Sequence, residues 1–139
     1  MDIDAPCLQT YIGCIVAARC SGMFLESLMS AKPILVTAST GKTGRRVAQR
    51  LIARNLPVRH GARASTPPFD WENQSTWEAA LNGVQSVYIA FYPDLAIPSA
   101  PAAVQALTDL AVKSGVQRLV LLSGRGETVA QVCEDIVRN

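Results

Sequence analysis

Seven small and polar residues, Ala38 to Gly44, separate an apolar run from an amphipathic segment. The run Ile34 to Val36 is typical of a strand buried on both faces. The segment that follows carries apolar residues on one face and arginines elsewhere, as expected of a surface helix. A short loop that leads into a helix can bind an anion, because the first helical N–H groups lack partners and the helix dipole is positive there.

Two phosphate-binding patterns fit this loop. In the dinucleotide fingerprint G-x-x-G-x-x-G, Gly41 would let the backbone approach a pyrophosphate and Gly44 would let the helix lie close to the strand, while Ala38 replaces the first glycine. In the P-loop pattern, Gly41-Lys42-Thr43 fits the end, but the first glycine falls at Val36. No apolar strand downstream ends directly in an Asp that could position magnesium. The pattern favours the dinucleotide interpretation, and a turn without any ligand is the third alternative.

The next predicted strand, residues 58–63, bears on the choice of dinucleotide. An acidic residue at its end would hold the 2′-hydroxyl of NAD, but the sequence has Arg59 and Arg63. An arginine suits the 2′-phosphate of NADP, and Arg63 follows the glycine loop by about twenty residues, the expected reach. We therefore expect NADP, with NAD as the alternative cofactor and a solvated loop arginine as the alternative role for Arg63.

Strands are expected at residues 34–36, 58–63, 69–71, 84–91 and 116–122, with helices between them and a last helix at 128–137. This alternation predicts an α/β fold, a Rossmann-type doubly wound parallel sheet with strand order 3-2-1-4-5. Ligands bind such sheets at the carboxyl ends, where the strand order reverses. Loop residues there that could face a substrate are Tyr92, Ser123 and Arg125, although a serine at the exit of a strand is more often a helix N-cap.

Composition and charge limit the partners, metal sites and cellular location that the chain is expected to have. The 139 residues suggest one domain, and 49% apolar and 17% charged residues are ordinary for a soluble globular protein. The net charge of +2 is weak and the arginines are spread along the sequence, which argues against a nucleic-acid partner. Four cysteines without a C-x-x-C pair, and His60 as the single histidine, argue against a metal site and favour a reduced, cytoplasmic chain.

Residues 1–30 differ from the rest and are predicted to be an N-terminal extension of a domain at 31–139. Their apolar stretch, Tyr11 to Ala18, is too short to cross a bilayer, so no membrane partner is expected. Asp2 and Asp4 precede that stretch, which disfavours a secretory signal peptide with its basic front end.

Four segments together resemble the NmrA-like family of atypical short-chain dehydrogenases: residues 34–46, 69–71, 80–84 and 114–124. Within that family, residues 40–44 and 123–126 are most similar to the festuclavine and agroclavine dehydrogenase branch. The resemblance implies an NAD(P)-binding oxidoreductase that transfers hydride between NADP(H) and a small organic substrate. The positions that it assigns to the cofactor are Thr40, Gly41, Lys42, Thr43, Gly44, Arg63, Asp70, Trp71, Ala90 and Phe91. The first five would lie along the pyrophosphate, Arg63 at the 2′-phosphate, the next pair at the adenine, and the last pair at the ribose and nicotinamide.

The sequence departs from this family in two further respects. None of its tyrosines has a lysine four residues later, so the catalytic residues stay unnamed. Family members continue past the fifth strand with a sixth strand and a carboxyl-terminal substrate region, which this sequence lacks. We expect an NADP-binding, oxidoreductase-like protein whose catalysis is in question. The alternatives are a non-catalytic dinucleotide-binding sensor or interaction module and an inactive, shortened paralogue. An exposed sheet edge would favour a homodimer.

Overall fold

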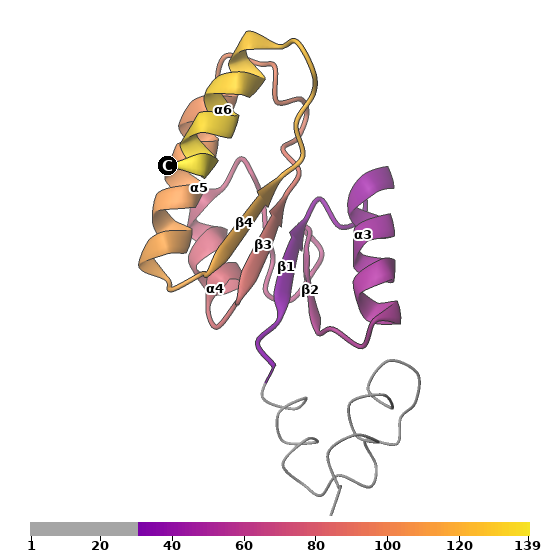
Figure 1. Ribbon diagram of the computed structural model, residues 1–139. Coiled ribbons are helices and arrows are strands. Elements are labelled where there is room, and N and C mark those ends of the chain that lie inside the picture. Colours follow the sequence, from indigo (N-terminus) through magenta and orange to yellow (C-terminus); the bar gives the residue numbers. More distant parts are fainter. Residues whose placement is uncertain (1–30) are drawn as a thin grey trace, which may run out of the picture. The chain divides into compact units, whose positions relative to one another are not determined.

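The computed structural model describes residues 31–139, which form a parallel sheet with helices on both faces (Figure 1). The elements in chain order are β1 (Ile34–Thr37), α3 (Lys42–Ala53), β2 (Val58–Gly61), the 3₁₀ helix η2 (Gln74–Thr76), α4 (Trp77–Leu81), β3 (Ser86–Ile89), α5 (Ala100–Lys113), β4 (Arg118–Leu121) and α6 (Thr128–Arg138). The predicted extension, residues 1–30, lies outside the described part of the chain.

The four strands are all parallel and lie in the order β2-β1-β3-β4. Val36 pairs with His60 on one side and with Tyr88 on the other, so β1 is central. The chain runs outward from β1 to β2 and then crosses to β3 on the other side. The predicted α/β class and the predicted order of these four strands are confirmed, and the order reverses between β1 and β3.

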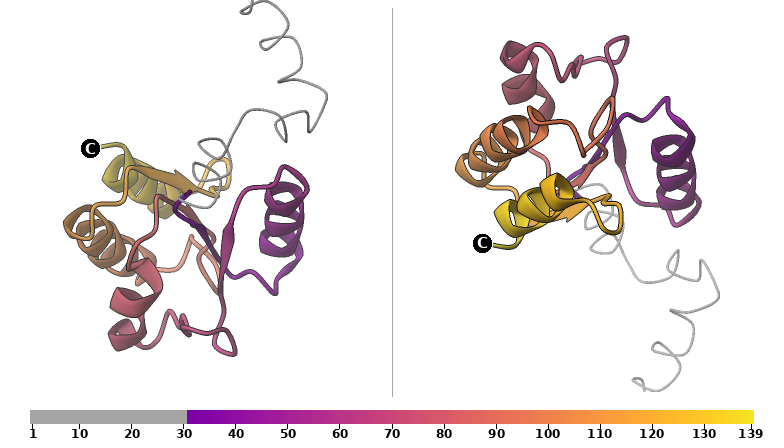
Figure 2. Two further views of the ribbon diagram at one scale, coloured as in Figure 1. Left: turned by 90° about the horizontal axis from the view of Figure 1, so that it is seen from below. Right: turned by 90° about the horizontal axis from the view of Figure 1, so that it is seen from above.

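The helices form two layers, one on each side of the sheet (Figure 2). Helix α3 packs on β1 and β2, while α4, α5 and α6 lie on the opposite face. A core of fully buried side chains joins the sheet to α4 and α5, including Leu35, Val87, Trp77, Leu81 and Leu107. The two faces are covered because a parallel sheet must bury both of its surfaces.

The predicted third strand, at residues 69–71, is wrong. Phe69 donates its N–H to the carbonyl of Ala62, and Asp70 forms only an isolated bridge with Asn73. The prolines just before Phe69 lack N–H donors, so this segment cannot supply a continuous ladder. The aromatic side chains pack against one another and against Trp77 instead.

Candidate functional site

The loop between β1 and α3 contains four residues, Ala38 to Gly41. Ala38 has a φ of +49°, in the left-handed region that favours glycine. Its carbonyl accepts a hydrogen bond from the N–H of Gly41 at 2.9 Å, which closes the turn. The first glycine of the dinucleotide fingerprint is thus missing at a position whose backbone conformation favours glycine.

Gly44 allows the helix to approach this turn closely. It is buried, and a Cβ atom at this position would collide with the carbonyl oxygen of Ala38 and lie 2.8 Å from the carbonyl carbon. No side chain fits there without moving backbone. The predicted role of Gly44, close packing of the helix on the strand, is therefore consistent with the geometry.

Among residues 31–139, no side-chain hydrogen bond caps the N-terminus of α3. Gly41 is the N-cap, no side chain accepts from the first turn, and the first turn contains no acidic residue. The first intrahelical bond runs from Arg45 N–H to the carbonyl of Gly41, so the amides of Lys42, Thr43 and Gly44 precede the helical ladder. Three consecutive N–H donors at the positive end of a helix dipole suit a phosphate oxygen.

Ser39 adds a second polar feature to the loop. It is 5% exposed, and its hydroxyl is buried with no hydrogen-bond partner. Its N–H reaches the carbonyl of Gly61 at 3.4 Å, which places the loop beside the exit of β2. A buried hydroxyl without a partner is uncommon and fits a loop that binds a polar ligand.

The P-loop alternative does not fit this geometry. Val36, where its first glycine would fall, is fully buried inside β1. The strand ends at Thr37 and the helix begins at Lys42, which leaves only four loop residues to wrap around a phosphate. The exits of β3 and β4 carry no acidic residue that could position magnesium.

The two arginines around the end of β2 have different environments. Arg59 donates through Nη1 to the carbonyls of Ala80, at 2.9 Å, and Asn82, and so caps the carboxyl end of α4. Its Nη1 is therefore engaged with α4. Arg63 is exposed on the loop that follows β2. A hydrogen bond of 2.9 Å, which the N–H of Phe69 donates to the carbonyl of Ala62, closes that loop.

Trp71, Ala90 and Phe91 come together from distant parts of the chain. The indole N–H of Trp71 donates to the carbonyl of Ala90 at 3.1 Å, and its ring lies 4.9 Å from that of Phe91, centroid to centroid. Asp70 precedes Trp71, and its carboxylate accepts from the N–H of Glu72 at 3.0 Å. These residues lie together at the exit of β3, next to the point where the strand order reverses.

Thr37 is a residue that the sequence analysis missed. It is fully buried, its hydroxyl accepts the N–H of Ala90 at 2.8 Å, and it donates to the carbonyl of Tyr88 at 3.0 Å or of Ala90 at 3.3 Å. This bond ties the exits of β1 and β3 together. A polar residue at the end of an apolar strand is the only sequence signal, and it does not identify the partner.

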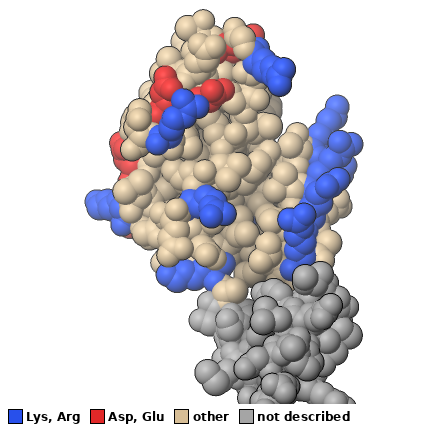
Figure 3. Space-filling view, in the orientation of Figure 1, with Lys and Arg blue, Asp and Glu red and all other residues tan. Residues whose placement is uncertain are grey.

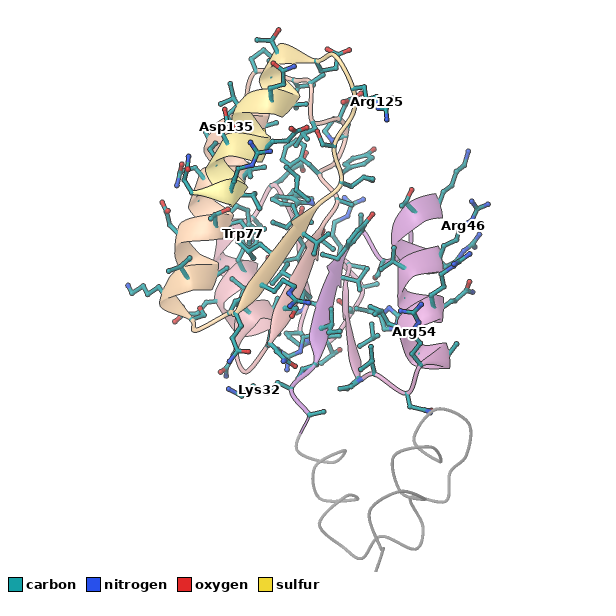
Figure 4. The ribbon with its side chains drawn as sticks, viewed as in Figure 1. Lys32, Arg46, Arg54, Trp77, Arg125 and Asp135 are labelled. Atoms are coloured by element: carbon teal, nitrogen blue, oxygen red, sulfur yellow. The ribbon has the colours of Figure 1, made fainter. Side chains whose placement is uncertain are left out.

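The three candidate substrate residues have different environments. Tyr92 is 68% exposed, and Arg125 projects from the loop between β4 and α6 (Figure 4). Ser123 donates to a carboxylate oxygen of Glu134 at 2.5 Å. Because α6 begins at Thr128 with Glu127 as its N-cap, Ser123 is not the cap of that helix.

Two buried or partly buried side chains have a raised pKa. Burial raises the pKa of the Tyr88 phenol on the sheet and of the Cys133 thiol in the packing between α5 and α6.

Across residues 31–139, no three side chains of the metal-ligating types converge. In the same part of the chain, no helix combines the length and apolarity that a membrane crossing requires.

An open groove of about 590 Å³ lies along β4 and α6, away from the glycine loop. It is lined by Leu119, Leu121, Leu122, Ser123, Glu134, Val137 and Arg138. The glycine loop instead presents backbone donors on an open surface.

Comparison with known proteins relates the chain to oxidoreductases. It is 32% identical over 103 residues to the uncharacterized oxidoreductase YesF of Bacillus subtilis, matching 69% of this chain and 35% of that protein. It is also 32% identical over 100 residues to agroclavine dehydrogenase of Claviceps fusiformis, matching 65% of this chain and 35% of that enzyme. The chain thus spans about a third of the length of these curated relatives. No protein-family model matches the sequence.

Solved structures share the fold. A short-chain dehydrogenase/reductase superfamily protein of Agrobacterium tumefaciens with bound NAD has a TM-score of 0.61 at 20% identity, covering 76% of this chain and 44% of that one. Triphenylmethane reductase of Citrobacter sp., in complex with NADP(H), has a TM-score of 0.60 at 18% identity, covering 76% and 45%. At these identities, the comparisons establish the Rossmann-like fold.

Proposed function

We propose that residues 31–139 form the dinucleotide-binding half of an oxidoreductase of the NmrA-like atypical short-chain dehydrogenase type, with NADP(H) as its cofactor. The observation that carries the proposal is the uncapped N-terminus of α3, held against the turn at Ala38 by the side-chain-free Gly44. This arrangement leaves three amides for a pyrophosphate, and the Ser39 hydroxyl is buried in the same loop without a hydrogen-bond partner. The two oxidoreductase relatives and the cofactors named for the two solved structures support it.

The other cofactor contacts follow from the loops at the same end of the sheet. Arg63, on the loop after β2, would pair with the 2′-phosphate, since Arg59 is engaged with α4. Asp70 and Trp71 would border the adenine, and Ala90 and Phe91 the ribose and nicotinamide.

Bound NADPH would supply a hydride to a carbonyl, imine or quinone of a small organic substrate. Tyr92, Ser123 and Arg125 are the candidate contacts on the substrate side.

Calorimetric titration of the purified chain with NADPH and with NADH tests this proposal. We expect NADPH to bind more tightly than NADH. The Arg63→Gln variant should lose about 10- to 100-fold in NADPH affinity, because a charge-assisted bond to phosphate contributes roughly 1.5–3 kcal/mol. Its affinity for NADH should stay within about twofold, since NADH carries no 2′-phosphate.

Arg118→Gln is the matched control, because it removes an exposed arginine from β4 at the far edge of the sheet. It should leave both affinities unchanged. A folded protein that binds neither dinucleotide would refute the proposal and favour a non-catalytic interaction module. Equal losses in both variants would place the 2′-phosphate elsewhere.

A further inference from the structure

The exposed surface of α3 carries a row of cations. We call the side chains Lys42, Arg45, Arg46, Arg50 and Arg54 the α3 basic stripe; all five are exposed. In the space-filling view they form a continuous band along the helix (Figure 3), and Arg46 projects away from the sheet (Figure 4). The sequence analysis treated the arginines as scattered, and this was wrong, because the helix brings five cations onto one surface.

The spacing of the stripe has an electrostatic consequence. Lys42, Arg46, Arg50 and Arg54 follow one another at intervals of four residues, which places successive cations about 6 Å apart along the helix. Like charges at this spacing repel, and cations in the first turn also oppose the helix dipole. The ion pair found within residues 31–139, Arg138 with Asp135, lies on α6. No described acidic side chain therefore offsets the repulsion along α3.

The net charge of +2 conceals a separation of charge along the chain. Residues 32–69 contain eight lysines and arginines and no acidic residue, whereas residues 70–139 contain four basic and eight acidic residues. The β1-α3-β2 half is therefore strongly positive and the remainder is negative. Such a one-sided positive surface attracts polyanions over distances of about a Debye length.

We propose that the α3 basic stripe binds the phosphodiester backbone of a nucleic acid without sequence preference. Four of the five cations are arginines, which bind phosphate oxygens in a bidentate manner. A 12-residue helix is about 18 Å long, which equals the rise of about five nucleotides along the duplex axis at 3.4 Å each. Helix α3 carries no aromatic residue on which a base could stack, so recognition rests on the backbone.

The same helix is poorly suited to a lipid surface. An amphipathic membrane helix inserts its apolar face between lipid headgroups. In α3 that face includes the buried Ala48 and the half-buried Val47 and Leu51, and it is turned toward the sheet. Ile52, 53% exposed, is the one large apolar side chain that α3 itself exposes.

Fluorescence anisotropy with a labelled duplex of about 20 base pairs tests the proposal on the full chain. Three to five phosphate contacts predict that log K falls with log salt concentration at a slope of roughly −2.7 to −4.5, or about 40- to 500-fold between about 50 and 200 mM salt. The triple variant Arg46→Gln, Arg50→Gln, Arg54→Gln should bind at least about tenfold more weakly at the lower salt. Its slope should be shallower by about 2.7.

The matched control replaces the same number of exposed cations on the negative half: Lys113→Gln, Arg118→Gln, Arg138→Gln. Both variants lose three positive charges, so only the position of the loss differs, and circular dichroism checks that both are folded. Equal weakening in both, or no binding by the parent chain, would overturn the proposal. Binding to phosphatidylserine vesicles but not to the duplex would overturn it in favour of a membrane surface. The variants leave Lys42 and Arg63 intact, so NADPH binding is measured separately. A failure to bind NADPH would not affect the result for nucleic-acid binding.

Discussion

Replacing Ala38 by glycine is expected to stabilise the domain. Ala38 adopts a φ of +49° at the turn between β1 and α3. In the left-handed region, the clash of the Cβ of an L-residue with the backbone lowers the free energy of unfolding by about 1–2 kcal/mol, and glycine avoids that clash.

The net effect is smaller because glycine also increases the entropy of the unfolded chain. That term lowers stability by about 0.5–1 kcal/mol relative to alanine. The balance predicts that Ala38→Gly raises the free energy of unfolding by about 0.5–1 kcal/mol. For a domain of this size, the melting temperature should rise by roughly 2–8 °C.

Ala102→Gly is the matched control for the entropy term. Ala102 is exposed near the start of α5 and is not among the described residues with a positive φ. Its replacement should lower stability by about 0.5–1 kcal/mol. Urea denaturation of both variants measures the difference, which should be about 1–2 kcal/mol in favour of Ala38→Gly. If both variants lost the same stability, the backbone at Ala38 would not be left-handed and the reasoning would be refuted.

Three other changes have expected outcomes. Gly44→Ala should lower the free energy of unfolding by about 1–3 kcal/mol or more, because the added Cβ meets the turn at Ala38. Gly124 has open space around it, so Gly124→Ala should change the free energy of unfolding by less than about 0.5 kcal/mol in the same urea titration. Thr37→Val should lose about 1–3 kcal/mol by leaving the buried N–H of Ala90 unpaired, and Thr37→Ser should recover most of it; equal losses would assign the effect to packing. Since burial raises the pKa of the Cys133 thiol, the unfolded chain loses that proton first. The free energy of unfolding should therefore decline as pH rises above about 8.5, and less steeply in Cys133→Ala.

The fold was predictable where burial leaves a periodic pattern. The apolar runs around Leu35 and Val87 predicted central strands because both faces of those strands are covered. The glycine spacing at Gly41 and Gly44 predicted the turn into α3. The run at residues 69–71 misled, because its aromatic side chains pack in a cluster rather than in a ladder, and no periodicity separates the two over three residues.

The site was less predictable because its members are joined by long-range contacts. Thr37 reaches the backbone at Ala90, 53 residues away, and nothing in either segment identifies the other. The distance from the glycine loop favoured Arg63 over Arg59 in the sequence, but nothing there predicted that Arg59 caps α4. The charge separation, in contrast, is visible in the sequence, since no acidic residue occurs from residue 32 to 69. The overall net charge concealed it.

Phosphate binding by the start of α3 is tested most directly by an NMR titration of the ¹⁵N-labelled chain with NADPH. We predict that the amide signals of Lys42, Thr43 and Gly44 shift in a saturable manner and that AMP, which lacks the pyrophosphate, shifts them less. Arg63 should respond to NADPH and not to NADH. Saturable shifts confined to the groove between β4 and α6, with the α3 amides unmoved, would contradict the account.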